Sequence, residues 1–231
     1  SARVRIIYQG SGPSNAIAEA FGADLHSVSG RSPGNFEVKS SWDVSRGVRE
    51  VTERLDINQA KLVMGFRTTN ALEDTDVPAI RLMNALLGGT PHSLLFKNVR
   101  EALSLCYYCS SSYDRLGRVV LVESGVEEQN VSRAREEILR QIDAICAGRF
   151  SDEEAESARS SLINQFKTLG DMQSSLSSWY TGQSLDDDTT TPEQAAEQLC
   201  AVTRERIIQA ARTVKLGAVY MLGGEEGGHE Q

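Results

Sequence analysis

The chain has 231 residues, of which 40% are hydrophobic, enough to bury the core of one large domain or two small ones. Its formal net charge of −8 argues against nucleic acid as a partner, because phosphate binding needs a basic face. No run of about eighteen apolar residues occurs, so we expect no membrane-spanning helix. Four cysteines in a chain of this length fit a reducing compartment, and we expect a cytoplasmic protein.

The first part of the chain predicts one strand, one helix and a linker. Residues 3–10, RVRIIYQG, alternate and are rich in β-branched residues, which predicts a strand. Residues 14–25 predict a helix, and SGRSPGNFEVKSS, residues 29–41, has no periodicity. The opening RIIYQGSG resembles the closing AVYMLGGEEG, which suggests that the opening piece ends a preceding lobe of similar fold.

The remaining chain predicts strands followed by helices and a closing strand. Predicted strands cover residues 49–57, 59–69, 103–114, 117–126 and 215–224. Predicted helices cover residues 77–87, 90–103, 131–147 and 152–169, with two short ones beginning after Thr191 and Thr203. The second of these helices is expected to have Thr90 as its cap and Phe96, Val99 and Leu103 as its buried stripe. This order predicts an α+β fold, a mainly antiparallel sheet with helices packed on one face.

The sequence Cys106-Tyr-Tyr-Cys109 has the spacing of a zinc knuckle or a redox pair. However, it lies in a predicted strand, where residues three apart face opposite sides of the sheet. Cys146 and Cys200 stand alone on separate helices, and no histidine pair at helical spacing completes a metal site. We therefore expect small packed side chains here, and no metal or cofactor held by this chain.

Arg100 and Tyr107 leave two interpretations open. Spacing alone favours a solvated helix arginine and a strand tyrosine that is half packed in the sheet. Alternatively, the two side chains converge where the helix ends and the strand begins. A guanidinium fork and a phenol hydroxyl would then suit a peptide carbonyl or a developing oxyanion.

Residues 82–108, LMNALLGGTPHSLLFKNVREALSLCYY, resemble the second, non-catalytic lobe of the M16 (pitrilysin-like, inverzincin) peptidases. In that family a helix ends in Gly-Gly, an Arg-Glu helix follows, and Leu-x-Tyr opens a strand. The matching positions are Leu87-Gly88-Gly89, Ser93, Leu95-Phe96, Arg100-Glu101, Leu105 and Tyr107. Residues 59–68 and the stretch VTRERIIQAARTVKLGAVYML also resemble that lobe, and the CYYC and Pro-His-Ser details most resemble a YfmF-type bacterial branch.

The resemblance implies a function that the spacing alone does not give. In the family, the arginine and tyrosine seven residues apart reach toward the zinc site of the first lobe, so Arg100 and Tyr107 become substrate-binding candidates. This chain lacks H-x-x-E-H, so the resemblance implies no catalytic residue here and zinc in another lobe or partner.

The implied role is the non-catalytic C-terminal half of a zinc metallopeptidase, inactive alone, which closes the chamber and binds a peptide or small protein. Its partner would be a zinc-bearing M16 subunit or a homo-oligomer; the alternative is an inactive scaffold or protein-binding module. The implied division is 1–30 for the terminal strand and helix of a preceding lobe, 31–45 for a linker, 46–224 for the M16-type lobe and 225–231 for a flexible tail.

Overall fold

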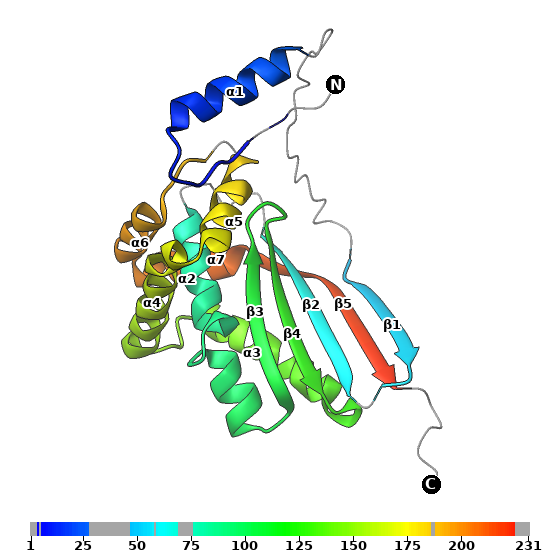
Figure 1. Cartoon of the computed structure of the whole chain (residues 1–231). Coiled ribbons are helices and arrows are strands. Elements are labelled where there is room, and N and C mark those ends of the chain that lie inside the picture. The colour runs from blue at the N-terminus through cyan, green and yellow to red at the C-terminus, as the bar shows by residue number, and fades with distance from the viewer. Residues whose placement is uncertain are drawn as a thin grey trace.

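The computed structural model describes residues 4, 6–27, 47–57, 59–68, 76–185 and 188–224, and its centre is a five-stranded sheet (Figure 1). The strands lie side by side in the order β1-β5-β2-β4-β3. Their bounds are β1 Arg49–Leu55, β2 Ala60–Thr68, β3 Cys106–Asp114, β4 Val119–Val126 and β5 Val214–Gly224. Four strands pair antiparallel, whereas β1 runs parallel to β5 at one edge. The predicted α+β fold with a mainly antiparallel sheet is confirmed.

Most helices pack over one face of this sheet, whereas the first, α1 (Ser14–Ser27), lies apart from it (Figure 1). Their bounds are α1 Ser14–Ser27, α2 Val77–Asn84, η2 Ala85–Gly89, η3 Phe96–Ala102, η4 Glu128–Asn130, α3 Val131–Cys146, α4 Asp152–Lys167, η5 Leu169–Asp171, α5 Gln173–Ser184, α6 Pro192–Cys200 and α7 Arg204–Thr213. On β2, Leu62, Met64 and Phe66 are buried, and the residues between them are partly exposed. This alternation places the core between the helices and one side of the sheet.

The predicted start signals hold for the helices of the second half. Ser151 and Glu154 form a reciprocal capping box at the start of α4, and Thr191 and Gln194 form another at α6. The Thr203 side chain accepts a hydrogen bond from the Arg206 backbone at the start of α7. These caps satisfy backbone donors that helix ends leave unpaired.

Two predictions for the segment that precedes the edge strand β3 are wrong, one for Thr90 and one for Leu103. Thr90 does not cap a helix, because its hydroxyl donates to the carbonyl of Ala85 (3.1 Å) and the next helical residue is Leu94. Leu103 is exposed and does not extend the buried stripe of Val99. The reason is that residues 85–89 and 96–102 wind as π-helices, whose wider turns shift the apolar face away from a spacing of three and four.

The N-terminal part also differs from expectation. Residue 4 and residues 6–9 form no strand, because no neighbouring strand pairs with them in the described part of the chain. Helix α1 confirms the predicted helix, although none of its described side chains is buried. The predicted linker, residues 31–45, and the predicted tail, residues 225–231, lie outside the described residues.

Candidate functional site

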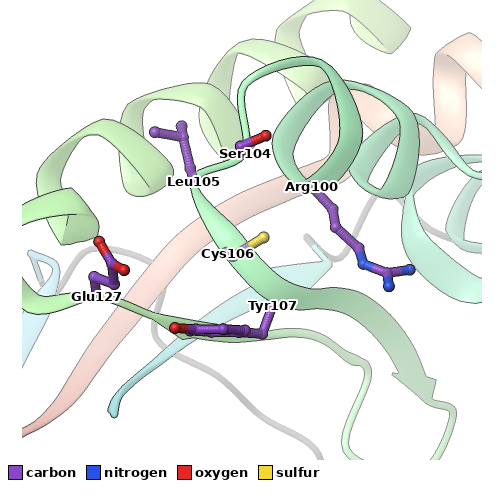
Figure 2. A pocket seen from close by; sticks show the side chains of 6 residues that line it. All are labelled: Arg100, Ser104, Leu105, Cys106, Tyr107 and Glu127. Carbon is purple, nitrogen blue, oxygen red and sulfur yellow. The ribbon is translucent and has the colours of Figure 1, made fainter.

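The candidate site is an open pocket where η3 ends and the edge strand β3 begins (Figure 2). Its volume is about 350 Å³, and it lies at one end of the sheet edge. The residues that line it are Arg100, Ser104, Leu105, Cys106, Tyr107 and Glu127. The structure therefore brings both predicted residues, Arg100 and Tyr107, to one pocket.

The π-helical winding of η3 positions Arg100. Arg100 lies in the last turn of η3 and is exposed, and its guanidinium carbon lies 4.6 Å from the centre of the Phe96 ring. The chain then leaves the helix through Ser104, which has a positive φ of 49°. The backbone of Leu105 donates to the carbonyl of Val99 (3.1 Å), which fixes the helix end against the start of β3.

A β-bulge positions Tyr107. Cys106 pairs with Val126 and Tyr108 pairs with Gly125, so Tyr107 is the extra residue on β3. Its side chain is 63% exposed, the largest value among the exposed large hydrophobic residues described. The sequence gives no sign of this bulge, because no glycine or proline stands at position 107.

Arg100 and Tyr107 point toward opposite ends of the pocket. Figure 2 shows the guanidinium and the phenol hydroxyl extending to opposite sides of the strand backbone. Within the described residues, neither group makes a hydrogen bond or an ion pair with the protein. Both groups are thus available to a ligand, and they could contact two separated positions on it.

The bulge also changes the interpretation of the two cysteines. The expectation that Cys106 and Cys109 face opposite sides of the sheet is wrong, because the extra residue shifts the alternation of β3 by one position. Cys106 is partly buried, Cys109 is buried, and their thiols share a hydrogen bond. The Ser124 hydroxyl on β4 donates to the backbone carbonyl of Tyr108 (2.9 Å) and lies near both thiols.

These contacts separate the acidities of the two thiols. The hydrogen bond with Cys109 lowers the pKa of Cys106 to about 7, against the opposing effect of burial, and Ser124 and the charge of Arg100 lower it further. The hydrogen bond with Cys106, together with burial, raises the pKa of Cys109. This pair of unlike thiols was not predicted, and only the CYYC spacing in the sequence could have indicated it.

The described residues contain neither a metal-ligand cluster nor a helix that could cross a membrane. In that part of the chain, no cluster of three or more His, Cys, Asp and Glu residues is arranged to hold a metal ion. No helix there is both long and apolar enough to cross a membrane. The zinc that the resemblance implies therefore has no ligand set among these residues.

The chain belongs to the M16 peptidase family: residues 12–162 match the family described as the peptidase M16 inactive domain. The match is 34% identical to the probable inactive metalloprotease YmfF of Bacillus subtilis, over 78% of this chain and 42% of that protein. It is 26% identical to AlbE, a subtilosin biosynthesis protein of the same organism, over 85% of this chain and 50% of AlbE. This chain thus spans about half the length of the curated relatives it matches. The sequence predicts a YfmF-type branch, whereas the relative that is 34% identical is named YmfF.

Solved structures agree with this assignment. A conserved protein from Enterococcus faecalis V583 superposes with a TM-score of 0.73 at 29% identity, over 81% of this chain and 44% of that one. The peptidase M16 inactive domain from Pseudomonas fluorescens superposes with a TM-score of 0.71 at 15% identity, over 94% of this chain and 53% of that one. The second likeness shows a shared fold.

Proposed function

We propose that this chain is the non-catalytic, substrate-binding half of an M16 peptidase, closing the chamber opposite a zinc-bearing lobe or partner subunit. The supporting observation is the pocket at the start of β3. Arg100 and Tyr107 line this pocket, and their polar groups have no hydrogen-bonding partner among the described residues. A guanidinium and a phenol that stay unpaired at an open surface are suited to a polar ligand.

An extended peptide is the ligand that these two groups fit. The guanidinium donates several hydrogen bonds in a fixed plane and suits a carbonyl oxygen or a carboxylate. The phenol hydroxyl can donate to one peptide group or accept from another. Because the two groups point toward opposite ends of the pocket, we expect them to bind different residues of one extended segment.

The other lobe or subunit would supply the zinc. A zinc ion held there would activate the attacking water and polarise the scissile carbonyl. The role of this chain is to hold the peptide in register, which lowers the entropic cost of reaching the reactive geometry. We propose accordingly that the chain alone does not hydrolyse peptides.

Two substitutions test the proposal in the complex of the full-length protein with its zinc-bearing partner. We expect Arg100→Ala to lower kcat/KM for a peptide by about 10- to 150-fold, the loss of one charge-assisted hydrogen bond of about 1.5–3 kcal/mol. Tyr107→Phe removes one neutral hydrogen bond, so we expect a smaller loss of about 2- to 12-fold. Matched controls are Arg133→Ala on the exposed side of α3 and Tyr108→Phe beside the pocket, which should change kcat/KM by less than twofold.

The alternative is a scaffold without a role in peptide binding, and the name of YmfF as a probable inactive metalloprotease favours considering it. If Arg100→Ala and Tyr107→Phe behave like their controls, the substrate-binding role is wrong. A complex that still assembles and cleaves peptide with both variants would assign this chain to closing the chamber only.

A further inference from the structure

We propose that Cys106 and Cys109 form a peroxide-sensitive thiol pair, in which a hydroperoxide oxidises Cys106 and Cys109 then closes a disulfide. The proposal rests first on the bulge at Tyr107. On a regular strand, residues 106 and 109 would face opposite sides of the sheet and could not react with each other. The bulge places both cysteines on one side of the sheet, where Cys106 lies opposite Val126 and Cys109 lies opposite Ser124, two residues apart on β4.

The surroundings give the two sulfurs different roles. Cys106 lines the open pocket, so a small hydroperoxide can reach it from solvent. Cys109 is only 5% exposed, so it is protected from solvent and accessible mainly to its neighbour Cys106. Arg100 lines the same pocket, and its positive charge favours the thiolate form of Cys106. Glu127 lines the pocket near the phenol end of Tyr107 and carries the opposite charge (Figure 2).

The acidity of Cys106 supports the same assignment. With its pKa lowered to about 7, a much larger fraction of this thiol is thiolate at neutral pH than of an ordinary cysteine. The thiolate is the nucleophile that attacks peroxides. The Cys106 thiolate and burial raise the pKa of Cys109, which keeps that residue as a thiol in the reduced pair. Once Cys106 is a neutral sulfenic acid, its charge no longer raises this pKa, so Cys109 can give up its proton as it attacks.

The reaction is balanced in two steps. The Cys106 thiolate attacks the terminal oxygen of the hydroperoxide, so an S–O bond forms, the O–O bond breaks, and the alkoxide leaves and takes up a proton as the alcohol. The sulfur, oxidised by two electrons, is now a sulfenic acid. Cys109 then attacks this sulfur, the S–S bond forms, and the hydroxyl group leaves with the Cys109 proton as water.

The local backbone can accommodate the bond. A disulfide of about 2.05 Å requires the two sulfurs to move closer than a hydrogen bond allows. Cys106 is the first residue of the edge strand β3, after Ser104 with its positive φ, so it is held by pairing on one side only. Closing the bond must shift the bulged Tyr107, which lies between the two cysteines. A shift of Tyr107 would change peptide binding only if the proposed function is right. The thiol chemistry does not depend on that function.

The test is peroxide treatment of the intact chain, followed by alkylation, trypsin digestion and mass spectrometry. Residues 101–115 form one tryptic peptide that contains both cysteines. With about one equivalent of hydrogen peroxide at pH 7, we expect this peptide to lose two hydrogens, while peptides with Cys146 and the exposed Cys200 stay reduced. In Cys109→Ala, Cys106 should instead accumulate as sulfenic acid that a 1,3-dione traps, and in Cys106→Ala the peptide should stay reduced.

Two results would overturn the proposal, and both are visible in the wild-type chain. One is oxidation of Cys106 to sulfinic acid without any loss of two hydrogens. The other is a midpoint at pH 8.5 or above for the alkylation of Cys106, where we expect about 7. Neither measurement needs a partner or a peptide, so its failure would leave the proposed function of Arg100 and Tyr107 untouched.

Discussion

Replacing Gly88 with alanine should destabilise the protein, because at Gly88 the η2 turn meets the edge strand β3. A Cβ atom at position 88 would lie 2.7 Å from the backbone nitrogen of Ser111 and 2.8 Å from a methyl carbon of Leu95. Ordinary contacts of this kind are at least about 3.4 Å, so η2 or β3 would have to move by several tenths of an ångström. The neighbour is strand backbone, which cannot rotate away as a flexible side chain can.

The expected size of the effect combines two opposing terms. Overpacking of a tight interior typically costs about 1–3 kcal/mol, and the backbone contact places Gly88→Ala at the upper end. Alanine recovers up to about 1 kcal/mol through its higher helix propensity. The net loss should be about 2 kcal/mol, which corresponds to a fall in Tm of about 4–8 °C for a chain of this size.

Urea unfolding, followed by circular dichroism, would measure this loss against a matched control. Gly182, in α5, has no atom within 4 Å of the position that a Cβ would occupy. Gly182→Ala should therefore stabilise the chain by about 0.5–1 kcal/mol, so the same substitution has opposite signs at the two sites. If Gly88→Ala is neutral or stabilising, the close approach of η2 to β3 is wrong.

Two further predictions concern side chains that join separate elements. Arg159 on α4 donates to the backbone carbonyls of Leu199 and Val202 (2.9 Å for Val202), and its side chain is largely buried. Arg159→Ala should therefore lower the free energy of unfolding by about 2–3 kcal/mol. A loss below about 0.5 kcal/mol in urea unfolding would refute this. Burial raises the pKa of Asp188, but hydrogen bonds from Thr190 and the ion pair with Arg115 (2.6 Å) outweigh it and lower the pKa overall. Stability from Asp188 is therefore complete above the unfolded pKa of about 3.9 and lost as the pH falls through the lower folded pKa. After allowance for solvent screening, Asp188→Asn should lower the free energy of unfolding by about 1 kcal/mol at pH 7 and by progressively less as the pH falls below about 4. If wild type and variant still differ by the full amount at about pH 2, the inferred direction of the pKa shift is wrong.

Much of the fold could be predicted because local patterns and tertiary packing agree. The β2 strand is apolar on both faces at its centre, and the structure places it in the middle of the sheet. The capped helices α4, α6 and α7 begin at the residues that their capping side chains predict. The sequence predicts no helix at residues 173–184, because the serine-rich α5 has a weak apolar stripe and buries only Gln183 among its residues.

The details of the site could be predicted only in part. Family likeness, not spacing, singled out Arg100 and Tyr107, and the pocket contains both. The π-helical turn and the bulge depend on how η3 and β3 pack against each other, and neither has a local signal in the sequence. A regular alternating strand predicts that the two CYYC thiols lie on opposite faces of the sheet. In the structure the bulge places both on the same face.

The most direct test of the proposed function is to purify the protein from its own cells, to sequence the chains that bind it and to assay the complex for zinc. We expect a stoichiometric zinc-bearing M16 partner, or a zinc-bearing lobe on the same polypeptide, with H-x-x-E-H. Finding neither the motif nor zinc would contradict the account, and this chain would then be a scaffold or binding protein in which Arg100 is a solvated surface arginine.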